Sequence, residues 1–387
     1  MHDLSLSAKI KAYFPEHPEH IVRNLLIACW SIFGAKTTNL NKAKEEVPAL
    51  LGNGADVDEH ANYTRLIRFF KTENRDELVQ CMLTVCCLFL KSGRGRKVKY
   101  LVLDGTEWEL GESPVQLLTL CVLWNDVAVP IWWEDLEKIG HSSQEERKLL
   151  ITNAIKRYQF RGMVLLADRE YIGEDWFTFL REQGIEFVIR LKANVYHEQV
   201  NAAGGPRQSK LEHMAKSRRY GYRADKSIAI NNHQYRYIVA RNLKDDPKEP
   251  LIYLLTSLKQ AIKALAAYRL RWKIEICFKH LKSNGFDLEA MNFKNPSKRK
   301  LMMAVVVFLY VLAVHEGFFA TQKDIDCKKT FKTFKKTKLK TELKTLAVSF
   351  FRKGVSAMHR KIANFKELIS WLSSILAYLR KPNWCHV

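Results

Sequence analysis

The sequence lacks the local signatures of several common protein classes. Its eight cysteines include no C-x-x-C pair and form no recognisable zinc or disulfide pattern, so we expect reduced thiols. The stretch Ser92–Lys97 lacks the spacing of an ATP-binding phosphate loop, and we interpret it as a basic linker. Prolines around His17 and His20 favour an extended surface segment over a metal-binding pair.

Long hydrophobic runs and acidic residues are also scarce. The longest apolar run, Leu301 to Val314, is short for a bilayer span and predicts a buried helix. The N-terminus has no apolar core of a signal peptide, so we expect a cytoplasmic protein. Lysine and arginine number 63 against 41 acidic residues, which gives a net charge of +22 and a pI near 9.6. This balance favours a polyanionic partner, and nucleic acid fits it better than a membrane.

The most informative motif consists of Tyr268, Arg271, Glu275 and Lys282, separated by two, three and six residues. At about 100° per residue, one helix would bring all four side chains into a single stripe. Apolar residues fall on the adjoining arc and predict a face packed on the core: Leu270, Ile274, Cys277, Phe278 and Leu281. The alternative is a solvated helix face, because charges at these intervals also support exposed helices.

Two aspartates end short apolar runs elsewhere in the chain. Asp104 follows VKYLVL and Asp168 follows MVLLA, and each run predicts a buried strand with the acid at its carboxyl end. Ligands gather outside the carboxyl ends of strands in α/β sheets, so both acids can face one site. The alternative is that each aspartate only forms a turn or caps a helix.

Together with Glu275, the two aspartates predict a cluster of three carboxylates. Oxygen ligands of this kind suit Mg²⁺ and Mn²⁺, and two such ions about 3.5–4 Å apart can promote phosphoryl displacement. Without metal, the carboxylates would repel one another, and at least one would tend to take up a proton.

With these motifs in place, the chain resembles the DDE transposases of bacterial insertion sequences. The resemblance is to the branch marked by a Tyr-Arg-Glu-Lys signature, within the ribonuclease-H-like and retroviral integrase superfamily. It is carried by LDGTEW at Asp104, ADREYIGEDWF at Asp168 and YRLRWKIEICFKHLKS at Glu275. It implies that these three acids are the catalytic triad and bind two Mg²⁺ ions, for which Mn²⁺ can substitute.

The same resemblance implies a set of DNA contacts. Tyr268, Arg271 and Lys282 would contact phosphates near the scissile bond of the transposon end. Further contacts with double-stranded DNA are predicted from charge and family likeness, with a solvated basic surface as the alternative: Arg169, Lys279, Arg65, Arg68, Arg218 and Arg219. Synapsis of two transposon ends implies a homodimer on DNA.

Alternating apolar runs predict an α/β fold: a ribonuclease-H-like mixed sheet with flanking helices. We expect strands at Val98–Asp104, 116–124, 163–168 and 186–191, and a helix through roughly Tyr158 that opens at the capping box of Ser143 and Glu146. The predicted domains are a helical DNA-binding domain (1–92), a catalytic core in two parts (97–194 and 261–318), a β-rich insertion (195–260) and a basic helical C-terminal region (319–387).

The insertion is predicted because the stretch between Asp168 and Glu275 is much longer than one strand and one helix require. Its strand-like segments flank a turn at Asn231-Asn232. Relatives with such an insertion often form a DNA hairpin and hold a flipped base on a tryptophan. No tryptophan occurs in 195–260, and Tyr220, Tyr222 or His213 are the available substitutes.

We therefore predict a nucleoid-associated bacterial transposase that cleaves and joins DNA, with hairpin-mediated cut-and-paste as the implied route. Two alternatives remain open. One is a ribonuclease-H-like endonuclease without strand transfer, and the other is a DNA-binding descendant that has lost catalysis.

Overall fold

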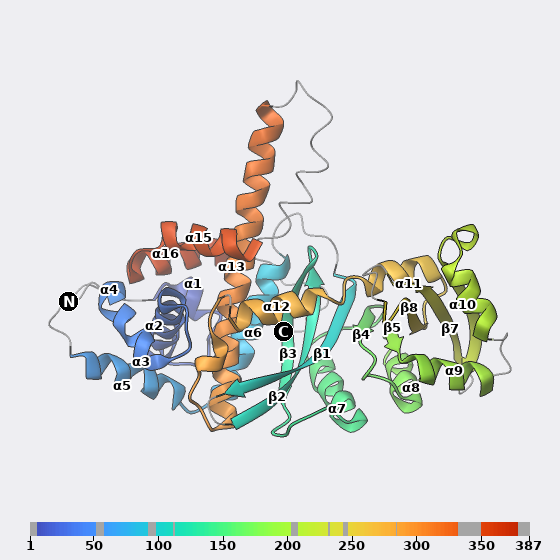
Figure 1. Cartoon of the computed structure of the whole chain (residues 1–387). Coiled ribbons are helices and arrows are strands. Elements are labelled where there is room, and N and C mark those ends of the chain that lie inside the picture. Colours follow the sequence, from blue (N-terminus) through green and yellow to red (C-terminus); the bar gives the residue numbers. More distant parts are fainter. Residues whose placement is uncertain are drawn as a thin grey trace.

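The computed structural model describes residues 6–51, 58–91, 98–110, 113–202, 208–230, 233–242, 247–283, 285–331 and 350–377. The predicted linker Ser92–Lys97, the Asn231-Asn232 turn and most of the lysine-rich stretch that follows Lys323 lie outside these residues. The strands of 100–135 lie between the helices of the N-terminal region and the helices and strands of 193–268 (Figure 1).

The N-terminal region is helical, as predicted. Its two long apolar segments form α2 (Glu19–Ala35) and α6 (Arg75–Lys91). All residues of α2 from Leu25 to Phe33 are buried. The basic segment around Tyr63 forms α5 (Glu59–Phe70). Asp58 caps the start of this helix, because its side chain accepts a hydrogen bond from His60 N. The remaining elements are short: α1 (Ala8–Lys11), α3 (Leu40–Ala43), η1 (Lys44–Glu46) and α4 (Val47–Leu51).

Eight strands form one mixed sheet in the order β3-β2-β1-β4-β5-β8-β7-β6. The first three make an antiparallel meander, and β4 and β5 then run parallel to β1. Their bounds are β1 (Tyr100–Leu110), β2 (Ser113–Trp124), β3 (Val127–Asp135), β4 (Val164–Ala167) and β5 (Glu186–Leu191). This arrangement confirms the predicted ribonuclease-H-like α/β class. The strand β3 was not among the predicted strands.

Helices between the strands lie where the apolar pattern predicts them. The capping box is present, since Ser143 Oγ accepts from Glu146 N and the Glu146 carboxylate accepts from Ser143 N. The helix that it opens, α7 (Gln144–Ile155), ends earlier than predicted, and α8 (Glu174–Glu182) leads into β5.

The β-rich insertion extends the central sheet. Its strands are β6 (Arg223–Ile230), β7 (His233–Arg241) and β8 (Leu251–Thr256), and β8 pairs antiparallel with β5. Three helical elements precede them: α9 (Ala193–Ala202), α10 (Gln208–Lys216) and η2 (Arg218–Tyr220). The insertion therefore continues the edge of the core next to β5.

The predicted buried helix is confirmed as part of α13 (Pro296–Phe331), whose residues from Leu301 to Val314 are all buried. Its Pro296–Gln322 part is long and apolar enough to cross a membrane, yet 94% of its most apolar window is buried inside the protein. It is thus a core helix in this fold. Two helices follow and pack back on the body: α15 (Phe350–Lys361) and α16 (Phe365–Leu376). The domain boundaries themselves stay predictions.

Candidate active site

The parallel register of β1 and β4 places two of the predicted acids side by side. Leu103 lies opposite Ala167 in this pair, and each is followed directly by an aspartate, Asp104 and Asp168. The prediction that Asp104 ends its strand is wrong, because β1 continues to Leu110 in its antiparallel pairing with β2. Asp104 instead lies where the parallel pairing ends, so both carboxyl groups reach the same edge.

The third acid is brought in by a break in the signature helix. The prediction of one continuous helix is wrong: α11 (Ala261–Tyr268) ends at the tyrosine, and α12 (Lys273–Leu281) begins just before Glu275. Tight turns join the two helices. In these turns Leu270 N donates a hydrogen bond to Ala267 O, and Arg271 N donates one to Tyr268 O. Arg271 belongs to this break, and its side chain reaches the two aspartates. The predicted apolar face is buried except for Leu270, which is half-buried.

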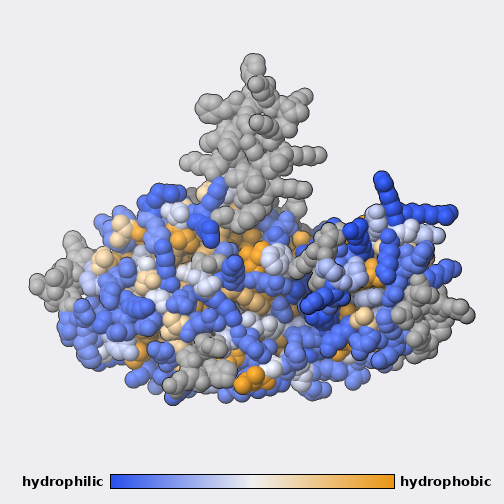
Figure 2. Space-filling view, in the orientation of Figure 1, coloured by the Kyte–Doolittle hydropathy of each residue, from blue (hydrophilic) through white to orange (hydrophobic). Residues whose placement is uncertain are grey.

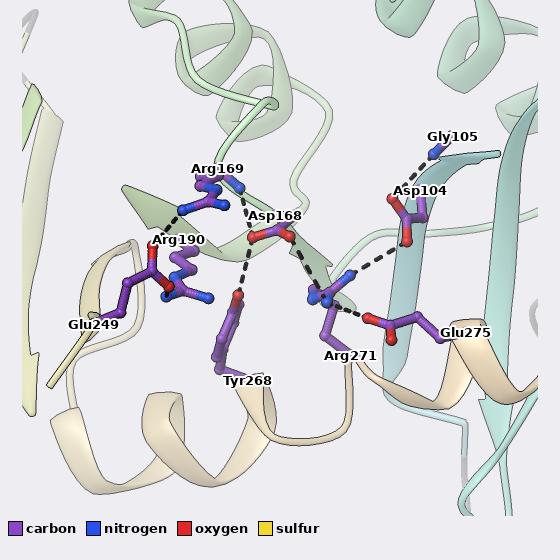
Figure 3. Close-up of polar contacts among 9 residues, drawn as sticks. All are labelled: Asp104, Gly105, Asp168, Arg169, Arg190, Glu249, Tyr268, Arg271 and Glu275. Carbon is purple, nitrogen blue, oxygen red and sulfur yellow. Dashed lines mark hydrogen bonds and ion pairs between the residues drawn. The ribbon is translucent and has the colours of Figure 1, made fainter. Parts of the chain in front are cut away.

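One guanidinium contacts all three acids (Figure 3). Arg271 Nη1 lies 3.2 Å from Asp104 Oδ2, and its Nη2 lies 2.5 Å from Glu275 Oε1 and 3.7 Å from Asp168 Oδ2. The Arg271 side chain is only 13% exposed. In this structure Arg271 thus neutralises carboxylates, and its side chain is not turned outward to a DNA phosphate.

The other carboxylate oxygens of the two aspartates are held by local donors. Asp104 Oδ1 accepts from Gly105 N at 3.1 Å, and Asp168 Oδ1 accepts from Arg169 N at 2.8 Å and from the Tyr268 hydroxyl at 3.3 Å. As Figure 3 shows, this leaves the Oδ2 atoms pointing at the guanidinium. The site therefore has three oxygens, one from each acid, converging on a single positive group.

The predicted repulsion among the acids is visible at Asp104. The pKa of Asp104 is raised to about 7, chiefly by burial; Arg271 acts against this rise, and the charges of Asp168, Glu170 and Glu275 add to it. One guanidinium therefore does not fully compensate the cluster. The expectation that one carboxyl group tends to hold a proton is confirmed in direction.

Two hollows meet at the aspartates. A cavity of about 440 Å³ extends from Asp104 and Asp168 along α12, and it is lined at its far side by Lys279 and Lys282. A second cavity, of about 680 Å³, extends from the same aspartates in another direction, towards Arg169 and Lys192. The acids thus lie at the junction of a groove with cations on both sides.

The signature lysine contributes to the groove from a fixed position. Lys282 directly follows the last residue of α12. Its ammonium group donates a hydrogen bond to Glu107 O at 2.8 Å and forms an ion pair with Glu289 at 3.2 Å. Its ammonium lies 5.7 Å from the centre of the Trp108 ring. Lys282 is therefore anchored beside the acids, whereas Lys279 is exposed at the same cavity.

The sequence analysis missed a second basic group at the site. Ile189 lies opposite Ala167 in the parallel β4–β5 pair, so Arg190 follows in line with Asp168. Glu249 Oε1 accepts from Arg169 at 2.5 Å and its Oε2 from Arg190 at 2.6 Å. A cavity of about 390 Å³ surrounds this trio and adds Lys192, Lys216 and Lys248. The signal that could have found Arg190 is its place at the carboxyl end of the next apolar strand.

Four predicted DNA-contact residues lie away from the acids. Arg65 and Arg68 are on α5, and Arg218 and Arg219 are in η2 of the insertion; none of the four lines the cavities described above. Tyr220 and Tyr222 are 41% and 37% exposed, and each has an arginine over its ring. Hydrophilic side chains dominate the face shown in Figure 2, with apolar ones in small groups.

The donor set fits a divalent cation. It consists only of carboxylate oxygens, it already surrounds one positive group, and its charge is not fully compensated. As the side chains stand, no three His, Cys, Asp or Glu residues of the described segments form a ready metal cage. The reason at this site is that the Arg271 guanidinium lies among the three acids.

Comparison with known proteins finds a family match over the middle of the chain. Residues 134–312 match the family of transposase DDE domains. The matched range of this DDE domain contains Asp168 and Glu275 and begins after Asp104. The match supports a transposase, and transposases of this family generally use divalent metal ions.

The chain was also compared with curated proteins and with solved structures. No curated protein matches the chain. Among solved structures, the chain is similar to the piggyBac transposase in a cryo-EM structure of its synaptic complex with hairpin DNA. The sequences are 9% identical, the TM-score is 0.44, and the alignment covers 96% of this chain and 82% of the other.

Proposed function

We propose that this chain is the DNA transposase of a bacterial insertion sequence, which binds the inverted-repeat ends of its element, cleaves them and joins them to target DNA. The observation that carries the proposal is the meeting of Asp104, Asp168 and Glu275 around one positive group, in a groove lined by cations. The match to the transposase DDE domain supports the same activity.

In this proposal the three acids form the catalytic centre. Asp104, Asp168 and Glu275 would hold Mg²⁺, or Mn²⁺ in its place, and two such ions would activate a water or a 3′-hydroxyl for in-line attack on phosphorus. The Tyr268 hydroxyl orients Asp168, and the backbone N–H groups of Gly105 and Arg169 fix the two aspartates. The protein thus supplies a preorganised set of oxygens before DNA arrives.

The flanking cations would bind the DNA backbone. Lys279 and Lys282 lie on one side of the acids, and Arg169 and Arg190 lie on the other, so a strand crossing the acids would have its phosphates neutralised on both sides. We assign flanking duplex contacts to the more distant cations, Arg65, Arg68, Arg218 and Arg219.

We further propose a homodimer in the synaptic complex, a hairpin intermediate and a location on the bacterial nucleoid in the cytoplasm. The β-rich insertion beside the acids supports the hairpin route, because relatives with such an insertion often use it. Two transposon ends must be processed together, which supports a dimer on DNA.

The test uses the full chain with a duplex that carries the inverted repeats flanking its gene. With Mg²⁺, we expect nicking at the repeat boundary, a hairpin product on a denaturing gel, and joining of pre-cut ends to a plasmid. Glu275→Gln is expected to lower cleavage by more than about 100-fold, because a direct ligand is worth more than the outer contacts that cost 10–100-fold. Glu182→Gln, an exposed change of the same kind on α8, serves as the control.

Three outcomes would overturn the proposal in different ways. Cleavage without joining of pre-cut ends would indicate an endonuclease. Binding of the repeats with no metal-dependent cleavage would indicate a non-catalytic DNA-binding descendant. Full cleavage by Glu275→Gln would remove this glutamate from the catalytic centre.

A further inference from the structure

The Arg271 side chain lies where an added cation would have to bind. Its guanidinium nitrogens contact Asp104 Oδ2, Asp168 Oδ2 and Glu275 Oε1. For the two aspartates these are the oxygens that local backbone donors leave open, since Gly105 N and Arg169 N hold the Oδ1 atoms. A metal ion and the guanidinium would therefore compete for the same three oxygens.

Arg271 cannot leave this position by losing its proton. A guanidinium stays protonated in proteins, and Arg271 lies among three carboxylates that favour its charged form. A guanidinium has no lone pair with which to bind a metal ion itself, and two cations at one set of oxygens repel each other. Binding of a divalent ion thus requires the Arg271 side chain to move.

The local backbone gives the side chain somewhere to go. Arg271 belongs to the turns between α11 and α12, and the cavity that contains Arg271 also contains Lys279 and Lys282. A guanidinium that swings from the acids into this cavity would remain in the groove, where its planar fork suits a phosphate.

We propose that Arg271 is a built-in counter-cation that closes the acid site, and that a divalent ion binds by displacing it from Asp104, Asp168 and Glu275. The inference rests on the proposed function, because it takes these three acids as the metal ligands. It assigns Arg271 two positions: among the acids before metal binds, and towards a phosphate afterwards. In the absence of metal and DNA, the arginine holds the three carboxylates together and lowers the affinity of the site for metal.

The experiment measures Mn²⁺ binding to the full chain by isothermal titration calorimetry without DNA. Arg271→Gln removes the competing charge while keeping a polar side chain. We expect this variant to bind Mn²⁺ at least about tenfold more tightly than the unchanged protein, because Mn²⁺ no longer has to break the ion pairs of Arg271. Its melting temperature without metal should fall, and the rise on adding Mn²⁺ should be larger than for the unchanged protein.

Arg269→Gln is the matched control. Arg269 precedes Arg271 by two residues, carries the same charge and is exposed. The loss of Arg269 lowers the net charge of the protein by the same amount as the loss of Arg271. A Mn²⁺ affinity within about twofold of the unchanged protein would show that competition by Arg271 at the acids, and not the overall positive charge, weakens Mn²⁺ binding. Glu275→Gln should weaken the same binding isotherm, which shows that the titration reports the acid site.

Arg271→Lys keeps the proposal testable if Arg271→Gln does not fold. Lysine retains one charge but lacks the fork that reaches three carboxylates, so its Mn²⁺ affinity should lie between those of the unchanged protein and Arg271→Gln. An affinity equal to or below that of the unchanged protein in the folded Arg271 variants overturns the inference. If the unchanged protein still cleaves its DNA ends, the proposed function stands. If Mn²⁺ binding ignores Glu275→Gln and no cleavage occurs, the proposed function itself fails.

Discussion

The Tyr268 hydroxyl donates a hydrogen bond of 3.3 Å to Asp168 Oδ1, which also accepts from Arg169 N. Burial, followed by the charge of Asp168, raises the pKa of Tyr268 to about 12, so the hydroxyl keeps its proton at any ordinary pH. The first residue of the signature therefore touches a catalytic candidate, and it does so from the C-terminal end of α11.

Tyr268→Phe tests this positioning role. The variant keeps the buried ring and loses only the hydroxyl, so we expect the free energy of unfolding to fall by about 1 kcal/mol. Cleavage of repeat-end DNA should slow severalfold while the affinity for DNA stays the same, because the aspartate loses one of its two orienting donors. Urea unfolding, cleavage rates and gel-shift titration measure the three quantities. An unchanged cleavage rate would contradict the positioning role.

Glu249 gives a second prediction, because its carboxylate forms ion pairs with two arginines beside the acids. Its carboxylate pairs with Arg169 and Arg190, and a DNA phosphate would compete with it for the same groups. Glu249→Gln should tighten DNA binding by about three- to tenfold at low salt, and the gain should shrink as salt screens the charges. Glu198→Gln, an exposed change on α9 in the same part of the molecule, is the control. Equal affinities for the two variants would argue against a phosphate site here.

Local patterns in the sequence predicted the parts of the site that depend on local structure. Apolar runs before Asp104 and Asp168 predicted two buried strands, and the capping box at Ser143 predicted where α7 begins. The expectation that both aspartates can face one site is met because the two strands pair in parallel, which the apolar runs alone did not reveal.

The contacts of Arg271 could not be predicted in the same way. Helical periodicity placed it in one stripe with the other signature residues, because their spacing fits a straight helix, and the family resemblance implied a contact with DNA. The break at 269–272 depends on where α11 and α12 pack against the sheet, and that packing is not encoded in the spacing. The pairing of β8 with β5 is similarly non-local, since strand-like segments do not reveal which edge they join.

The crossing of α13 and α15 yields a stability prediction. Gly354 on α15 faces Gly317 on α13, and a Cβ added at Gly354 would collide with the carbonyl oxygen of Ala313. Neither backbone can yield without separating the helices. Gly354→Ala should therefore lower the free energy of unfolding by about 2 kcal/mol or more, despite the better helix propensity of alanine. Ser356→Ala, exposed on the same helix, should change it little. Equal unfolding midpoints in urea would contradict the close crossing.

His280 on α12 provides a pH-dependent prediction. Its ring lies 4.5 Å from the Phe351 ring, and its buried Nδ1 has no hydrogen-bond partner among the described residues. Burial, with help from the charges of Arg352 and Lys279, lowers the pKa of His280 to about 4 from its usual value near 6.5. Between these two pH values the unfolded chain binds a proton that the folded chain does not. The free energy of unfolding should therefore fall as the pH drops from 6.5 towards 4.

His280→Leu should remove this part of the acid sensitivity. The variant should therefore lose less stability than the unchanged protein between pH 6.5 and pH 4. His315, whose pKa burial lowers to about 3, is present in both proteins and contributes equally to both curves. Urea unfolding at several pH values from 7 to 4 measures the difference. Parallel stability curves for the two proteins would contradict the lowered pKa of His280.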